Sequence, residues 1–195
     1  MTNEKIEQAI LELEDLDKQG ESYSDTSGRF GWRNPIREDT GGLLRSLVIA
    51  SGARRVLEIG TGHGLSTLYL VTGLPEGVGA TVETVEFDPA VASSTQARMD
   101  ATGSPVRVHQ GDALAVIGRL EGTFDLVFLD AQKNQYLDYL QALIRQGSIG
   151  PGTVVLADNV IDRKEECLPF LSWFERQSVP HHIIPTSCGL LVARL

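Results

Sequence analysis

Cysteine and long apolar runs are scarce in this sequence, and each shortage excludes a class of protein. Two cysteines, Cys167 and Cys188, are too few for a disulfide scaffold and favour reduced thiols in a cytoplasmic protein. No apolar run approaches the roughly 18 residues that a membrane-spanning helix needs. Residues 1–10 carry three charged side chains where a signal peptide needs an apolar segment. We therefore expect neither export nor contact with a membrane.

Basic residues are also in short supply, which bears on the partners of the chain. The sequence has 17 lysines and arginines against 26 aspartates and glutamates, giving a net charge of −9 and a pI near 4.9. A wide interface with nucleic acid needs basic surface. The composition therefore disfavours nucleic acid as a partner, although it leaves room for a small basic patch.

The remaining composition is typical of a globular domain. Hydrophobic residues make up 42% of the chain, too many for a disordered protein. The 20 glycines and 8 prolines are spread along the sequence and exclude a coiled coil. A chain of 195 residues has the usual length of one domain, so we expect residues 1–195 to form a single unit.

Short β-branched runs alternate with stretches of helical periodicity. This alternation predicts an α/β fold with a single doubly wound, mostly parallel sheet, covered by helices on both faces, and a C-terminal antiparallel hairpin. In such sheets ligands bind beyond the carboxyl ends of the strands. The expected strands are Arg55–Ile59, Thr81–Phe87, Val106–His109, Phe124–Asp130 and Thr153–Asp158, with hairpin runs His182–Pro185 and Gly189–Arg194. The expected helices are Thr40–Ser51, Leu65–Gly73, Ala90–Ala101, Ala113–Leu120, Gln135–Gln146 and Lys164–Gln177.

Two features precede this regular pattern. Apolar residues near helical spacing over Glu4–Leu16 predict an amphipathic helix. The segment Gly20–Pro35 is rich in glycine and polar residues but holds Tyr23, Phe30 and Trp32. A loop of this length is typical of a functional lid or of disorder. The aromatic residues favour a lid, with a loose linker as the alternative.

The first expected strand ends in a glycine-rich turn, Gly60-Thr61-Gly62-His63-Gly64. Glycine permits a tight turn and lets a ligand approach the bare backbone. Leu65 stands where the dinucleotide pattern G-x-G-x-x-G needs its third glycine, which weakens the case for a pyrophosphate ligand. An ordinary glycine-rich turn between a strand and a helix is the alternative.

Acidic residues follow the next two expected strands. Glu86 comes 26 residues after Gly60, and a carboxylate there can accept hydrogen bonds from the two hydroxyls of a ribose. A solvated carboxylate is the alternative. Asp112 can accept a hydrogen bond from the amine of adenine, or cap the next helix. Three strand ends thus offer bare backbone, an acceptor for the ribose hydroxyls and an acceptor for the adenine amine. This set indicates a ligand that contains adenosine.

Two further strands are expected to end in aspartate. If these strands are neighbours, about 4.8 Å apart, the carboxylates of Asp130 and Asp158 converge with the Asn159 amide at one edge of the sheet. Two carboxylates and an amide oxygen suit Mg²⁺ or another hard divalent cation. Without cysteine or histidine at these strand ends, zinc is a poor fit. The alternative is that the aspartates only cap the loops they begin.

Lys133 follows Asp130 by three residues, so a turn keeps the two side chains on the same rim. An amine beside a metal and a cationic cofactor can act as a general base. A solvated surface lysine is the alternative.

Together these residues resemble the cation-dependent class I S-adenosylmethionine O-methyltransferases of the catechol and caffeoyl-CoA type. The resemblance runs from about Pro35 to Leu195, and its most specific parts are Val56–Gly62, Phe128–Ala131 with Lys133 and Tyr136, and Leu156–Val160. It implies S-adenosyl-L-methionine as methyl donor, Mg²⁺ as cofactor and a small hydroxylated aromatic molecule as acceptor. A homodimer is compatible with it.

The resemblance also implies roles for single residues. Glu58 and Ser66 would hold the methionine part of the cofactor, Glu86 the ribose, and Asp112 and Ala113 the adenine. The main chain near Ile36, with Gly41 after it, matches the segment that closes over the cofactor. The implied cofactor set is Ile36, Glu58, Gly60, Gly62, Ser66, Glu86, Phe87, Asp112, Ala113 and Asp130. The implied metal ligands are Asp130, Asp158 and Asn159, and the implied catalytic residues are Lys133 and Asp130.

Three departures from the family pattern concern the acceptor side. Only Val160–Arg163 connects Asn159 to the next helix, where the caffeoyl-CoA type has a longer loop. Cys188-Gly189 replaces the usual Asp-Gly pair, and Gln132 replaces an aspartate or aromatic residue. The identity of the acceptor is therefore open, and we expect an open acceptor site.

Methyl transfer from S-adenosylmethionine to one hydroxyl of a catechol-like vicinal diol is the leading hypothesis. Methylation of a tRNA hydroxyuridine is a variant that the acidic pI disfavours. A nicotinamide-dependent oxidoreductase is disfavoured by Leu65 and by the lack of an obvious hydride-transfer pair. A non-catalytic adenosine-binding module is disfavoured by the intact set of Asp130, Lys133, Asp158 and Asn159.

Overall fold

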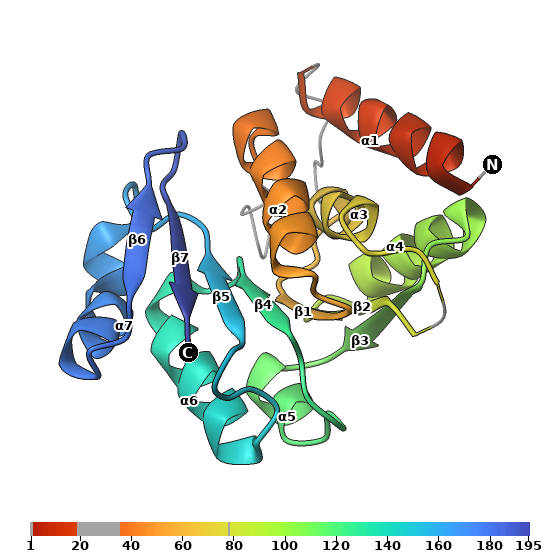
Figure 1. The fold of residues 1–195 in the computed structure, drawn as a ribbon. Coiled ribbons are helices and arrows are strands. Elements are labelled where there is room, and N and C mark those ends of the chain that lie inside the picture. The colour runs from red at the N-terminus through yellow and green to blue at the C-terminus, as the bar shows by residue number, and fades with distance from the viewer. Residues whose placement is uncertain (1, 19–35, 78) are drawn as a thin grey trace.

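The seven strands of the computed structural model, which describes residues 2–18, 36–77 and 79–195, form one sheet in the order β3-β2-β1-β4-β5-β7-β6 (Figure 1). The first five strands run parallel, and β7 is antiparallel to both β5 and β6. This confirms the predicted α/β fold with its C-terminal antiparallel hairpin. The strands are β1 Arg55–Ile59, β2 Thr81–Glu86, β3 Val106–Gln110, β4 Leu126–Leu129, β5 Val154–Ala157, β6 His181–Ile184 and β7 Leu190–Arg194.

Helices cover both faces of the sheet (Figure 1). They are α1 Thr2–Lys18, α2 Glu38–Ser51, α3 Leu65–Thr72, α4 Pro89–Thr102, α5 Ala113–Ile117, α6 Tyr136–Gln146 and α7 Lys164–Arg176, with a 3₁₀ turn, η1, at Lys133–Gln135. Each helix is too short or too polar to span a bilayer within the part of the chain that the structure describes. The segment predicted as a lid, Gly20–Pro35, lies outside the described residues.

Consecutive residues of the central strands enter two different cores. In β4, Leu126 and Phe128 pack with residues of α1, α2, α3 and α4. Their neighbours Val127 and Leu129 pack with α5, α6 and α7 on the opposite face. Strands buried on both faces carry uninterrupted apolar runs. This explains why short apolar runs located the strands correctly from the sequence.

The predicted N-terminal helix is confirmed and packs onto the domain. Its apolar stripe, which includes Ile6, Ile10 and Leu13, is buried in the core on the side of α3 and α4. At its C-terminal end, the Tyr69 hydroxyl of α3 donates a hydrogen bond to the Glu14 carboxylate. The helix is therefore part of the domain core.

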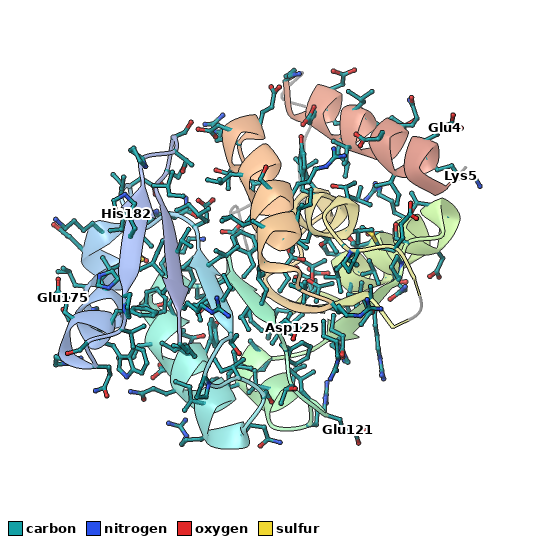
Figure 2. The ribbon with its side chains drawn as sticks, viewed as in Figure 1. Glu4, Lys5, Glu121, Asp125, Glu175 and His182 are labelled. Carbon is teal, nitrogen blue, oxygen red and sulfur yellow. The ribbon has the colours of Figure 1, made fainter. Side chains whose placement is uncertain are left out.

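The predicted strand Phe124–Asp130 was too long, because the structure has only Leu126–Leu129 as β4. The Asp125 carboxylate accepts hydrogen bonds from the backbone N–H groups of Arg54 and Arg55, both at 2.9 Å. This side chain ties the start of β4 to the start of β1. Asp125 and Glu121, labelled in Figure 2, mark this amino-terminal edge of the sheet.

Most other elements differ from the predictions by one to three residues at an end, and the clearest cases are in two helices and the hairpin. The helix predicted at Gln135–Gln146 begins at Tyr136, after the tighter η1 turn. The helix predicted at Ala113–Leu120 ends at Ile117. In the hairpin, β6 ends at Ile184 because Pro185 has no backbone N–H to donate.

Candidate active site

The carboxyl ends of the parallel strands place most of the predicted site residues at one edge of the sheet. Leu129, the last residue of β4, is paired in register with Ala157 of β5, and with Ile59 of β1 on its other side. The next residues along β4 and β5 are Asp130 and Asp158. The assumption that these two strands are neighbours is confirmed, and it brings the two carboxylates together beside the glycine-rich turn.

The glycine-rich turn needs glycine for two physical reasons. Gly60 has φ +104, a conformation that side chains rarely adopt. An added Cβ at Gly60 would also overlap the Asp130 carbonyl oxygen. The backbone of the turn therefore touches the backbone of the β4 end, so the predicted cofactor turn and the predicted metal ligand form one structural unit.

Glu86 holds the glycine-rich turn through its carboxylate. One oxygen accepts a hydrogen bond from the Gly62 N–H and the other from the Asp88 N–H, both at 2.9 Å. Burial raises the pKa of Glu86, and these backbone hydrogen bonds oppose the rise. Each carboxylate oxygen has a second lone pair. The side chain can thus brace the turn and still accept a ribose hydroxyl.

Glu58 lies behind the turn and is fully buried, with 0% of its surface exposed. Its carboxylate accepts hydrogen bonds from three hydroxyls, those of Ser66 and Thr67 in α3 and of Thr84 in β2. Because the Thr84 hydroxyl donates its hydrogen to Glu58, its oxygen is left as an acceptor. The Thr61 hydroxyl therefore donates to the Thr84 oxygen, at 2.6 Å. In the structure Glu58 therefore joins β1, β2, α3 and the turn.

Glu58 should make stability depend on pH in an unusual direction. Burial raises the pKa of its carboxyl to about 7, although the three hydroxyls oppose the rise. The folded state then binds this proton more tightly than the unfolded state, so this contribution to stability falls as pH rises from about 4.5 to 7. We expect the unfolding free energy of the wild type, relative to Glu58→Gln, to fall by up to about 3 kcal/mol across this range.

Urea unfolding of both proteins at several pH values between 4.5 and 8 measures this difference. Both proteins are measured in excess chelator, so that no bound metal ion shifts the titration of the other buried carboxylates. Parallel pH profiles for the wild type and Glu58→Gln would show that the Glu58 carboxyl does not titrate differently on folding.

Asp130, Lys133 and Asp158 form a cluster of charges at the ends of β4 and β5. The Lys133 amine lies 2.8 Å from one Asp130 oxygen, and both side chains are mostly buried. The Tyr136 hydroxyl donates to the Asp158 backbone carbonyl at 3.2 Å, so the first residue of α6 supports the end of β5. The predicted placement of Lys133 on the rim with Asp130 is confirmed. Its role as a base remains a prediction.

The charges of this cluster are not balanced by the described residues. Asp158 is 3% exposed, and its Oδ1 atom is buried with no hydrogen-bond partner in the part of the chain that the structure describes. Burial, followed by repulsion from Asp130, raises the pKa of the Asp158 carboxyl to about 7. A buried oxygen without a donor is costly. It indicates that a further positive group belongs beside it.

Asn159, the residue after Asp158, supplies a neutral amide oxygen. Its backbone has φ +64, and its side-chain amide donates to Asp162 at 3.3 Å, which leaves the amide oxygen free to bind a cation. Within residues 2–18, 36–77 and 79–195, no three histidine, cysteine or acidic side chains gather as a metal site. The set that fits a hard divalent cation is therefore two carboxylates and one amide, Asp130, Asp158 and Asn159.

The structure places the remaining predicted cofactor residues along the same edge. Asp112 caps α5 through the Ala115 N–H at 2.9 Å, so the capping interpretation is confirmed and the contact with adenine remains a prediction. The Phe87 side chain is 61% exposed beside Glu86. The Ile36 side chain is buried in the core, so only its main chain is available to a cofactor.

The turn between β6 and β7 covers the acceptor side. The Cys188 carbonyl accepts from the Ile161 N–H at 3.0 Å and the Asp162 N–H at 3.3 Å. Ser187 donates through its N–H and its hydroxyl to one Asp39 oxygen, at 2.9 and 3.0 Å. The hairpin turn thus connects the start of α2 to the short loop after Asn159. That loop is as short as predicted, since α7 begins at Lys164.

Sequence reasoning missed several residues that shape the site. The Thr67 hydroxyl in α3 and the Thr84 hydroxyl in β2 both donate to Glu58, and no local sequence pattern marks either of them for this role. Asp39 and Ser187 are 148 residues apart in the chain, and no local pattern connects them.

Comparisons with known proteins agree with this geometry. A family profile described as O-methyltransferase matches residues 24–164. The catechol O-methyltransferase of Mycobacterium tuberculosis is 39% identical over 133 residues, which cover 66% of this chain and 58% of that protein. That of Niastella koreensis is 34% identical over 132 residues, covering 65% and 58%. The chain thus spans little more than half the length of these curated relatives.

Solved structures show the same arrangement. Cofactor-bound Rv0187 from MTB has a TM-score of 0.75 at 31% identity, over 83% of this chain and 82% of that one. The O-methyltransferase TomG from Streptomyces achromogenes, in complex with SAM, has a TM-score of 0.70 at 27% identity, over 83% and 81%. With a family profile that matches well over half of the sequence, the chain belongs to the O-methyltransferase family.

Proposed function

We propose that the chain transfers a methyl group from S-adenosylmethionine to one hydroxyl of a catechol-like vicinal diol, with Mg²⁺ or another hard divalent cation as cofactor. The observation that carries the proposal is the buried Asp158 oxygen, which has no hydrogen-bond partner among the residues that the structure describes, at the strand edge that also carries Asp130 and the glycine-rich turn. Relatives named catechol O-methyltransferase support the class of acceptor.

The donor site rests on the glycine-rich turn and Glu86. The turn presents bare backbone, and the Glu86 carboxylate stands directly behind it. Related structures were solved with SAM or SAH bound. The position of Asp112 and Phe87 beyond Glu86 supports an adenosine site along the same edge.

The residues of the cluster have separate tasks in this reaction. Asp130, Asp158 and Asn159 would hold the cation, which supplies charge that makes a bound hydroxyl more acidic. Lys133, as the neutral amine, would accept the proton of the attacking hydroxyl. The hydroxyl oxygen then forms a bond to the methyl carbon as the bond from that carbon to sulfur breaks, in line, and S-adenosylhomocysteine leaves. The protein contributes mainly by holding donor and acceptor in this alignment.

Replacing Glu86 by alanine is expected to weaken S-adenosylmethionine binding by about 1.5–3 kcal/mol, the effect of hydrogen bonds to a charged group. The loss includes both the ribose contact and the support of the Gly62 N–H. Glu86→Gln keeps one acceptor oxygen and should lose less. Isothermal titration calorimetry measures the affinity.

Glu76→Ala, which removes an exposed carboxylate in the loop before β2, is the matched control for net charge. It should bind S-adenosylmethionine as the wild type does. An unchanged affinity in Glu86→Ala would remove Glu86 from the ribose site.

Transfer of a labelled methyl group tests the proposed function directly. Catechol, a coenzyme A ester of a catechol acid, and tRNA serve as acceptors in parallel assays. Turnover with catechol supports the proposal, and turnover with tRNA alone would favour the hydroxyuridine reaction instead. Binding of S-adenosylmethionine without turnover on any of them would favour the non-catalytic module.

A further inference from the structure

We propose that the preferred acceptor is a catechol that also carries a carboxylate, and that the Arg37 guanidinium binds this carboxylate. The inference rests on the proposed function and names the acceptor class for the same site. It follows from three features of the rim: a cation that no described carboxylate pairs with, its place at the acceptor side, and an apolar surface between it and the carboxylate cluster.

Arg37 is at the rim, and none of the described residues forms an ion pair with it. It precedes α2 directly as the N-cap residue and is exposed. Among the described residues, no carboxylate lies within 4.0 Å of its guanidinium, whereas Lys133 pairs with Asp130 and Arg163 with Glu166. An arginine presents a planar fork of donors that matches a carboxylate. Arg37 therefore has its full capacity for an anion from solution.

Hydrogen bonds place the start of α2 at the acceptor side. Asp39, two residues after Arg37, accepts from the N–H and the hydroxyl of Ser187. Arg37 and Ser187 both line an open hollow of about 630 Å³. The next residue, Cys188, is bonded through its carbonyl to the loop that follows Asn159. One continuous layer thus leads from Arg37 to the carboxylate cluster.

The charges acting on the Cys188 thiol agree with this layout. Burial, then the charges of Asp162 and Asp158, raise the pKa of the thiol, while the charge of Arg37 lowers it. Arg37 and the two carboxylates are therefore within electrostatic reach of the same side chain. Cys188 lies between the cation and the cluster, on the acceptor side of the sheet edge.

Two acidic residues also line the hollow, and both are accounted for. The Asp39 carboxylate accepts hydrogen bonds from the N–H and the hydroxyl of Ser187 and from the N–H and the hydroxyl of Thr40. Burial, the Glu14 hydrogen bond and then the charges of Glu14 and Glu38 raise the pKa of the Tyr69 hydroxyl, and no ion pair joins Glu38 to Arg37 among the described residues. Neither residue takes Arg37 as its partner.

Ile161 supplies apolar surface between the two charged ends. It is 48% exposed, two residues after Asn159, and its side chain lies against Gly189, where an added Cβ would overlap it. An aromatic ring can lie on this surface with its hydroxyls at the Asp158 end and a carboxylate toward Arg37. Neutral and cationic catechols would lack the second contact.

The test compares three acceptors of nearly equal size: 3,4-dihydroxybenzoate, 3,4-dihydroxybenzyl alcohol and 3,4-dihydroxybenzylamine. In the wild type the benzoate should have the lowest KM. Arg37→Gln should raise the KM for the benzoate about tenfold, between the effects of exposed and buried ion pairs. The KM for the alcohol should change less than about twofold, and so should kcat for the benzoate and for the alcohol. Arg37→Glu should reverse the order in favour of the amine.

A matched control and a binding measurement separate the possible failures. Arg145→Gln, in the last turn of α6, makes the same change in net charge and should leave all three KM values unchanged. Calorimetry of the benzoate and the alcohol, with S-adenosylhomocysteine and MgCl₂ present, should show the same tenfold loss for the benzoate alone.

Equal KM changes for benzoate and alcohol in Arg37→Gln, or no change for either, would overturn the role of Arg37. If the wild type methylates none of the three acceptors, the proposed function fails instead. The calorimetric comparison still decides whether Arg37 binds the carboxylate.

Discussion

Replacing Asp158 by alanine is expected to lower methyl transfer about a thousandfold or more, while S-adenosylmethionine still binds. Asp158 holds the one side-chain oxygen that is buried without a hydrogen-bond partner among the described residues. The proposed cation is bound mainly by this oxygen and by Asp130, and losing it removes several kcal/mol of transition-state stabilisation. Excess EDTA should have the same effect on the wild type, and Mg²⁺ should restore the activity.

The metal can be followed without turnover. Titration with Mn²⁺, detected by electron paramagnetic resonance, should show one bound ion in the wild type and none in Asp158→Ala. Asp138→Ala, an exposed carboxylate in the first turn of α6, controls for net charge and should keep both the ion and the activity. Full activity of the wild type in excess EDTA would contradict the metal mechanism and leave Lys133 as the only activating group.

The centre of the sheet could be predicted from the sequence because β1, β4 and β5 are buried on both faces. The bounds of β1, Arg55–Ile59, match the prediction because every residue after Arg55 is buried. Where side chains outside the strand decide the boundary, the prediction was wrong. The Asp125 carboxylate shortens β4 by binding the backbone of Arg54 and Arg55, and no local pattern shows that contact.

The position of the C-terminal hairpin in the sheet was also beyond sequence reasoning. The pairing of its strands follows from a short turn between two apolar runs. Its insertion beside β5, with β7 inside and β6 at the edge, depends on burial of Leu191 and Ala193 against the α5–α7 core. That choice is made by tertiary packing.

The core of the candidate site was predictable because parallel strands end at a common edge. Asp130 and Asp158 each follow an apolar run, so neighbouring strands bring them together without further information. The network around Glu58 was not predictable, since no local pattern shows that hydroxyls of α3 and of β2 converge on one buried carboxylate. The prediction that Glu58 holds the methionine part of the cofactor remains open, and the structure adds a bracing role.

Lys133→Ala is expected to lower kcat by about 10²–10⁴, the effect of losing a general base. The Lys133 amine lies 2.8 Å from Asp130 and 5.7 Å from the centre of the Tyr136 ring, so its position on the rim is held from two sides. Because η1 begins at Lys133, a short backbone turn carries the amine back toward the end of β4. Single-turnover rates with catechol at saturating S-adenosylmethionine measure the chemical step.

Lys133→Arg separates a base from a simple ion-pair partner. Arginine keeps the positive charge that pairs with Asp130, but it stays protonated and cannot accept a proton from the hydroxyl. If Lys133 is the base, Lys133→Arg should be about as slow as Lys133→Ala, and both should recover at high pH, where catechol ionises without help. If Lys133 only neutralises Asp130, the arginine variant should stay close to the wild type. If the rate of Lys133→Ala stays within about threefold of the wild-type rate throughout pH 6 to 9, the cation alone activates the hydroxyl. A missing base should lower the rate most at the acid end of that range.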